Sequence, residues 1–170
     1  AAVCNEVSKV SDLVQANATR QPSLIGNKLI FDGVDDNLTN SVISPAVTAT
    51  ATIAFVARIT ETNATTTHQT VLQSNVAGVS LAFTDTTVRI SGVATNIPFT
   101  HNKTWHRYIY VMNGTSHQLW VDGAKVGNPI TGVAPNIIAL QVGQIAAAAT
   151  LGMEVTEVSL SRVAITDPAW

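Results

Sequence analysis

Three aspartates crowd one stretch of the chain and could together hold a metal ion. Asp32, Asp35 and Asp36 lie in the segment F-D-G-V-D-D-N. Carboxylate oxygens are ligands that Ca²⁺ prefers, so the cluster is a candidate calcium site, and calcium is the one cofactor that the sequence suggests. The alternative is that these residues are there because Asp and Asn form turns and accept backbone hydrogen bonds.

A second group of residues could bind a sugar. His106, Tyr108 and Tyr110 alternate along one predicted strand and therefore share a face, and Trp120 lies on the following strand. Sugars place their C–H faces on aromatic rings and hydrogen-bond through their hydroxyls, so an exposed face of this kind would be a glycan platform. If the face is covered, the same rings form a second core layer with the tyrosine hydroxyls bonded at its rim.

Catalytic chemistry has little support in the sequence. Glycoside hydrolysis needs two carboxyl groups about 5 Å apart, or wider for inversion. The nearest pair is Glu154 and Glu157, and on a regular strand a spacing of three puts two side chains on opposite faces. The histidines show no H-E-x-x-H or H-x-H spacing for zinc, and no G-x-S-x-G occurs. We therefore expect a protein that is not an enzyme.

The composition points to assembly rather than to a charged partner. Charged residues make up 12% of the 170 residues, about half of the typical ~25%. Such a charge-poor surface suits a domain packed against copies of itself or inside a larger assembly, although a Thr/Asn-rich β protein would look similar. No basic run is present, which argues against binding nucleic acid through its phosphates.

Cysteine content and hydropathy exclude further classes. The single cysteine, Cys4, rules out an internal disulfide and a cysteine-rich zinc site. No apolar run approaches the ~20 residues of a membrane span, so we expect no membrane insertion. The sequence begins at Ala1 without Met, so we expect a processed or excised piece whose targeting signal is out of view.

The clearest structural signal is an antiparallel meander. Strands are predicted over 105–112, 117–121 and 124–126 because these segments are rich in aromatic and β-branched residues. Asn113-Gly114 and Asp122-Gly123 supply the two tight turns between them. The long segment 48–60 alternates on two fairly apolar faces and is predicted to be a central strand.

Short strands separated by turn residues recur along the whole chain. This spacing predicts an all-β fold, a two-sheet antiparallel jelly-roll β-sandwich. Residues 1–14 fit either a short helix or an irregular lead-in. We expect residues 1–24 to pack as a lead-in on a sandwich formed by 25–170, with Phe55 and Trp105 in its core. The other predicted strands are 28–31, 38–43, 71–74, 79–83, 87–90, 136–142 and 154–165, the last with a bulge or a change of buried face.

Several of these segments, in order, resemble a known family. The stretch L-I-F-D-G-V-D-D-N-L at 29–38, the lead-in at 16–24, W-H-R at 105–107 and L-W-V-D-G at 119–123 are similar to motifs of concanavalin A-like and laminin-G-like jelly-roll domains of phage and bacterial surface proteins. Asn37 departs from the pattern, which usually has an aromatic residue there. The resemblance implies a jelly roll and, in laminin-G-like members, calcium at a loop rim. The family includes lectins, glucanases and structural modules, so the fold leaves the function open.

These observations lead to one expected function and two alternatives. We expect a non-catalytic attachment or decoration module at a virion or extracellular surface, in contact with glycans. Its partners would be other subunits of the assembly, further copies of itself and a cell-surface glycan. The first alternative is a purely structural subunit that mediates assembly contacts. The second is a glycan hydrolase of the jelly-roll superfamily.

Overall fold

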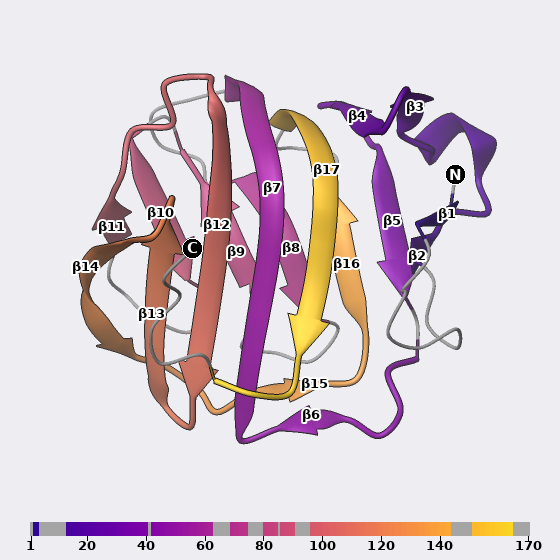
Figure 1. Ribbon diagram of the computed structural model, residues 1–170. Helices are drawn as coiled ribbons and strands as arrows, with labels where there is room; N and C mark the ends of the chain where they lie inside the picture. The colour runs from indigo at the N-terminus through magenta and orange to yellow at the C-terminus, as the bar shows by residue number, and fades with distance from the viewer. Residues whose placement is uncertain are drawn as a thin grey trace.

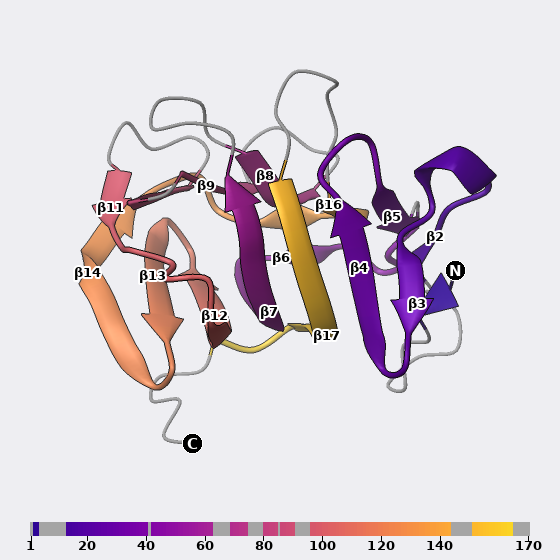
Figure 2. The ribbon, with the colours of Figure 1, turned by 90° about the horizontal axis from the view of Figure 1, so that it is seen from above.

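The chain folds into two antiparallel sheets stacked face to face, as Figures 1 and 2 show. The computed structural model describes residues 2–3, 13–40, 42–62, 69–74, 80–84, 86–90, 96–143 and 151–164. Apart from one short 3-10 turn, η1 (Ala18–Arg20), the regular elements in these ranges are strands. The predicted two-sheet antiparallel jelly-roll sandwich is thereby confirmed.

The front sheet of Figure 1 contains the predicted meander at one side. Its strands run in the order β14 (Ala124–Thr131), β13 (Ser116–Val121), β12 (Trp105–Asn113), β7 (Thr50–Thr62), β17 (Leu151–Ser161), β4 (Lys28–Asp32) and β3 (Ser23–Ile25). The turns have the expected backbone, with positive φ at Gly114 (57°), Asp122 (51°) and Gly123 (82°). β7 lies in the middle of the sheet, as its two apolar faces predicted.

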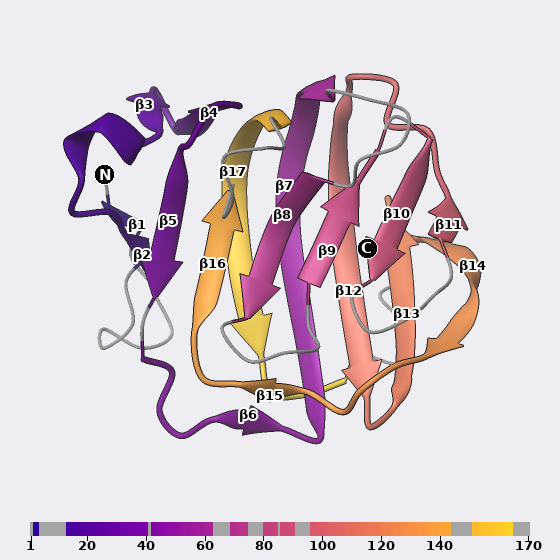
Figure 3. The same cartoon turned by 180° about the vertical axis from the view of Figure 1, so that it is seen from behind.

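The back sheet faces the viewer in Figure 3. Its strands run in the order β1 (Ala2–Val3), β2 (Leu13–Val14), β5 (Asn37–Asn40), β16 (Leu140–Gly143), β8 (Gln69–Ser74), β9 (Ser80–Phe83), β10 (Thr87–Ile90) and β11 (Asn96–Pro98). A third pair, β6 (Val47–Thr48) and β15 (Asn136–Ile137), runs along the lower edge of the molecule in Figure 1.

The core lies between the two sheets and is centred on aromatic rings. Phe55 of β7 stacks on Tyr108 of β12 with ring centroids 4.8 Å apart. Phe83 of β9 meets the same tyrosine from the back sheet at 5.3 Å. Fully burying each large side chain stabilises the fold by roughly 1.5–3 kcal/mol, so this cluster is a large part of what joins the sheets. The prediction that Phe55 is a core residue is confirmed.

Some elements differ from the prediction. The strand predicted over 136–142 is divided, because Asn136–Ile137 pairs with β6 whereas Leu140–Gly143 pairs with β5 and β8. Ser23–Ile25 and Asn96–Pro98 form strands that were not among those predicted. Residues 2–3 and 13–14 form a strand pair, and the rest of the predicted helix or lead-in at 1–14 lies outside the described residues.

No helical stretch that could cross a bilayer occurs in the part of the chain that the structure describes.

Candidate functional site

The four residues of the predicted glycan platform do not form one exposed surface. Tyr108 and Tyr110 have no exposed area and belong to the core between the sheets. Trp120 pairs in register with Ile109, so it lies on the opposite, outer face of the front sheet. His106 shares the inner face with the tyrosines at the rim. The core alternative therefore describes the two tyrosines.

Each buried tyrosine hydroxyl is paired with a buried histidine. The Tyr108 hydroxyl lies 3.1 Å from Nδ1 of His101, and the Tyr110 hydroxyl bonds Nδ1 of His117. Burial raises the pKa of both tyrosines well above its usual range, so both hydroxyls keep their protons at neutral pH. These pairs satisfy polar groups that would otherwise destabilise the interior.

Trp120 is also covered, but by a smaller cluster on the outer face. It packs with Ile109 and Val111, against Ala54 and Ala164, and only 8% of its surface is exposed. The Lys125 ammonium lies 5.0 Å from the centroid of its ring. With this lysine on the ring and the cluster around it, Trp120 offers little surface to a ligand.

Among the aromatic residues that the structure describes, Trp105 is the exposed one, whereas Phe99 is half-buried. The exposed fraction of Trp105 is 38%, so the prediction that it lies in the core was wrong. The reason is strand alternation: Trp105 begins β12 one residue before His106 and therefore projects on the outer face. Its odd spacing from Tyr108 was the sequence signal that the two side chains lie on opposite faces of the strand.

A row of charged side chains ends at the ring of Trp105. The Arg58 guanidinium lies 5.8 Å from the centroid of the Trp105 ring. Nη2 of Arg58 bonds one oxygen of Glu154 at 2.6 Å, and Nζ of Lys28 bonds the other at 3.2 Å. The hydrogen bond from Arg58, with that from Lys28, lowers the pKa of Glu154 although its burial acts against this. The row crosses β4, β17, β7 and β12, and it fixes the guanidinium beside the ring.

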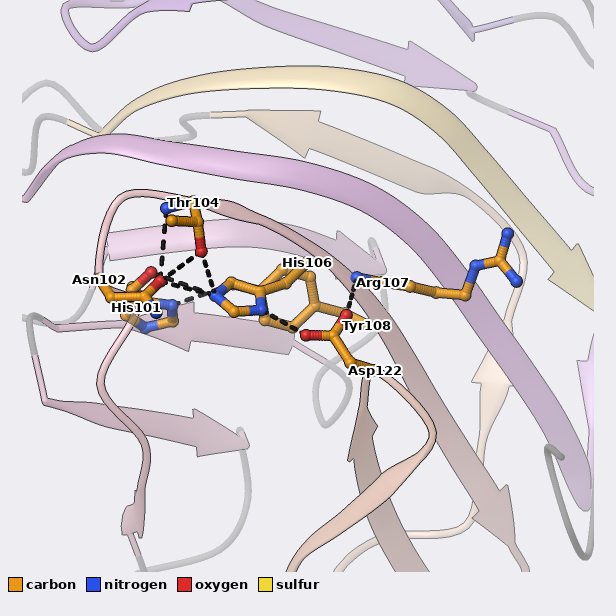
Figure 4. Close-up of polar contacts among 7 residues, drawn as sticks. All are labelled: His101, Asn102, Thr104, His106, Arg107, Tyr108 and Asp122. Carbon is orange, nitrogen blue, oxygen red and sulfur yellow. Dashed lines mark hydrogen bonds and ion pairs between the residues drawn. The ribbon is translucent and has the colours of Figure 1, made fainter. Parts of the chain in front are cut away.

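A polar network around His106 fixes the start of β12 (Figure 4). Nδ1 of His106 bonds Oδ2 of Asp122 at 2.6 Å, and Nε2 lies 2.8 Å from Oδ1 of Asn102 and 3.1 Å from Oγ1 of Thr104. Asp122 also accepts the backbone N–H of Arg107 at 2.8 Å, while the Arg107 side chain points away from the network. Both ring nitrogens thus face oxygen atoms.

This network also changes the pKa of the Asp122 carboxyl group. Burial acts to raise its pKa, but the hydrogen bonds from His106 and from the Arg107 backbone outweigh burial and lower it. Asp122 is therefore ionised at neutral pH and ties the turn after β13 to β12.

The possible acid pair lies on one face, contrary to the prediction from alternation. Glu154 pairs with Arg58 and Glu157 pairs with Val56, and a bulge between Val155 and Glu157 brings both glutamates to the outer face. Glu154 does not suit the role of a glycosidase's general acid, which needs a carboxyl group with a raised pKa. The pKa of Glu154 is instead lowered by its two cations.

The three aspartates converge, with carboxylate oxygens within 4.8 Å of one another. Two of them act as turn formers: Asp36 accepts the N–H of Asp32 at 2.8 Å, and Asp32 accepts that of Val34 at 2.7 Å. Asp35 pairs with Arg20 at 3.4 Å. Burial, and then the charges of Asp32 and Asp35, raise the pKa of Asp36. The turn role is present, and the donor set also suits a calcium ion.

Comparison with known proteins gives structural matches without sequence matches. No family model matches the chain, and neither does any curated protein. The sialidase of Trypanosoma rangeli is similar with a TM-score of 0.68 and 18% identity, over 92% of this chain and 28% of that one. The binding domain of botulinum neurotoxin serotype D/C gives 0.64 and 14%, over 86% of this chain and 43% of that one.

A third structure is botulinum neurotoxin type C, whose cell entry depends on interaction with two ganglioside molecules. It gives a TM-score of 0.62 and 12% identity, over 85% of this chain and 42% of that one. The chain thus spans less than half the length of each of these structures. At such identities the likeness is one of fold: the matched region of each structure shares the antiparallel β architecture of this chain.

Proposed function

We propose that this chain is a non-catalytic, glycan-binding attachment module of a virion or cell-surface assembly. The observation that carries the proposal is the exposed Trp105 ring with the Arg58 guanidinium next to it, which Glu154 holds in place. An exposed aromatic ring can bind the C–H face of a sugar at little cost in conformational entropy, because it has few rotatable bonds. The neighbouring guanidinium supplies donors for sugar oxygens.

Two of the structures that share this fold support glycan binding. The neurotoxin named above acts through gangliosides, and the sialidase has been studied with bound sialic acid. Both proteins interact with sugar-containing molecules, and both contain a region with this fold. The virion or extracellular location remains part of the proposal, as does assembly with other subunits.

The test is a glycan array followed by calorimetry on any sugar that binds. Trp105→Ala should weaken binding at least about tenfold, since aromatic anchors in binding sites typically contribute more than 1 kcal/mol. Trp105→Phe should retain part of the affinity, and Trp120→Ala is the matched control, because Trp120 lies on the same face of the sheet but is covered. Binding that survives Trp105→Ala would show that the sugar is bound elsewhere.

The alternative is an architectural subunit that binds no small ligand. It is favoured by the exposed aliphatic residues of the edge strand β3, where Leu24 is 64% and Ile25 is 59% exposed. Blank glycan arrays combined with a mass in solution that rises with concentration would favour this role.

A further inference from the structure

The segment between β14 and β15 closes the lower end of the sandwich in Figure 1. It leads from Thr131 at the end of β14 to β15, which pairs with β6. Ile137 of β15 has no exposed area and Val47 of β6 only 2%, and both belong to the main core cluster. Residues 132–135 therefore connect β14 to the β6–β15 pair, which covers this end of the core.

One buried histidine fastens this connection to the front sheet. His117 of β13 has no exposed area, and its Nε2 donates to the carbonyl of Val133 at 3.0 Å. Its Nδ1 accepts from the hydroxyl of Tyr110. A neutral ring with its proton on Nε2 therefore satisfies both contacts.

The packing around the ring is tight. A Cβ on Gly132 would lie 2.7 Å from Cε1 of His117, so the connection packs directly on the imidazole. Among the described residues, Tyr110 of β12 is the titratable group that faces the His117 ring. The ring also meets backbone groups, which are the carbonyl of Val133, Gly114 before β13, and Gly132.

A second proton would break this arrangement. It would have to enter at Nδ1, where the Tyr110 hydroxyl now donates, and that hydroxyl would then need a new acceptor in a fully buried position. It would also create a positive charge in the interior, where no carboxylate of the described residues lies beside the ring.

We propose that His117 is an acid-sensitive pin that holds residues 132–135 on the front sheet and releases them when its ring is protonated. Release frees β15 from β6 and uncovers Ile137 and Val47 at the lower end of the sandwich. This acid-dependent release does not depend on glycan binding. It would let an attachment module change its contacts on entering an acidic environment.

The expected direction with pH follows from linkage. Burial, which outweighs the bonds to the Val133 and Gly114 backbone, lowers the pKa of His117 from 6.5. The released state regains the ordinary pKa and therefore binds the proton more tightly. The attachment of 132–135 is at full strength above pH 6.5 and weakens as the pH falls toward the lowered pKa, by up to about tenfold for each pH unit.

Hydrogen exchange followed by mass spectrometry on the full chain tests this, with rates corrected for intrinsic exchange at pH 7.5 and 5.0. We expect the amides of 130–137 to lose protection at pH 5.0 while those of β7 and β12 keep it. His117→Gln retains a donor for the Val133 carbonyl and cannot titrate, so its exchange should not respond to acid. His106→Gln removes a histidine from the separate network around Asp122 and should keep the response.

Two results would overturn the proposal. One is equal protection of 130–137 in the unmodified chain at both pH values. The other is an acid response that persists in His117→Gln. If that variant does not fold, the histidine Cε1–H signals of the unmodified chain replace it: the buried ring should titrate below 6.5 together with the loss of protection. A ring that titrates at 6.5 or above without that loss also refutes the pin.

Discussion

Glu154 illustrates how one carboxylate can order a surface. Only 8% of this residue is exposed, and its two oxygens are divided between Arg58 and Lys28. Removing one charged side chain of such a group leaves its partner without an opposite charge. The resulting loss of stability is larger than the stability that an intact exposed ion pair contributes. The side chain touches no proposed ligand, yet it determines where the Arg58 guanidinium lies beside Trp105.

Glu154→Gln should lower stability by about 1 kcal/mol at neutral pH, since its partners are partly exposed and screened by solvent. The pKa of Glu154 is lowered in the folded state, so its contribution is present above 4.5 and is lost as the pH falls through the lowered value. Urea denaturation at pH 7 and pH 3 measures this. A difference between variant and parent that is as large at pH 3 as at pH 7 would contradict the assignment.

The aspartate cluster gives a second prediction for single residues. Asp36 has a raised pKa because it is buried beside Asp32 and Asp35, and a bound cation would relieve that repulsion. Millimolar calcium should therefore raise the melting temperature, and Asp35→Asn should reduce the increase. Melting curves that are identical in calcium and in chelator would leave the cluster with its turn-forming role alone.

At the scale of elements, two local irregularities decide on which face a side chain lies and how closely two segments pack. The bulge in β17 turns Glu157 to the same face as Glu154, although their spacing in a regular strand would separate them. Gly143 ends β16 with φ of +89°, where a Cβ would lie 2.5 Å from the carbonyl oxygen of Asp36 and 2.7 Å from Cε1 of Phe31. The absence of a side chain there lets the aspartate turn pack against the back sheet.

Gly143→Ala should destabilise the fold by more than about 2 kcal/mol, because it adds a backbone clash to an unfavourable φ. Gly26→Ala is the matched control, since Gly26 also has a positive φ (+63°) but a Cβ added there would meet no atom within 4 Å. We expect the control substitution to cost about 1 kcal/mol. Equal urea midpoints for the two variants would show that the close approach at Gly143 is unimportant.

For the whole molecule, the low charge and the open sheet edge together favour association. Charged residues are 12% of the chain, and β3 ends the front sheet with Leu24 and Ile25 exposed. Edge strands with exposed apolar side chains pair readily with other chains unless a charge blocks them.

We therefore predict self-association that depends on concentration. Sedimentation velocity should show a mean mass that rises with concentration, and Leu24→Lys should reduce this rise because it removes an exposed apolar side chain as well as adding a charge to the edge strand. Ser23→Lys on the same strand controls for the added charge without the loss of an apolar side chain. A single monomeric species at high concentration would count against both the association and the architectural alternative.

The sequence by itself determined the features that depend on neighbours along the chain. The two turns of the meander, the long central strand and the aspartate turn follow from local backbone preferences and from alternation with period two. These forces act over a few residues, so the antiparallel sandwich could be predicted without any knowledge of tertiary contacts.

Only the tertiary structure decided which residues meet and which face of each strand is covered. Glu154 meets Lys28 and Arg58 from 126 and 96 residues away, and no local pattern contains that pairing. Alternation placed Tyr108 and Tyr110 together but could not show that the back sheet covers them while Trp105 reaches solvent. Burial is set by the packing of one sheet on the other, which depends on contacts distant in sequence.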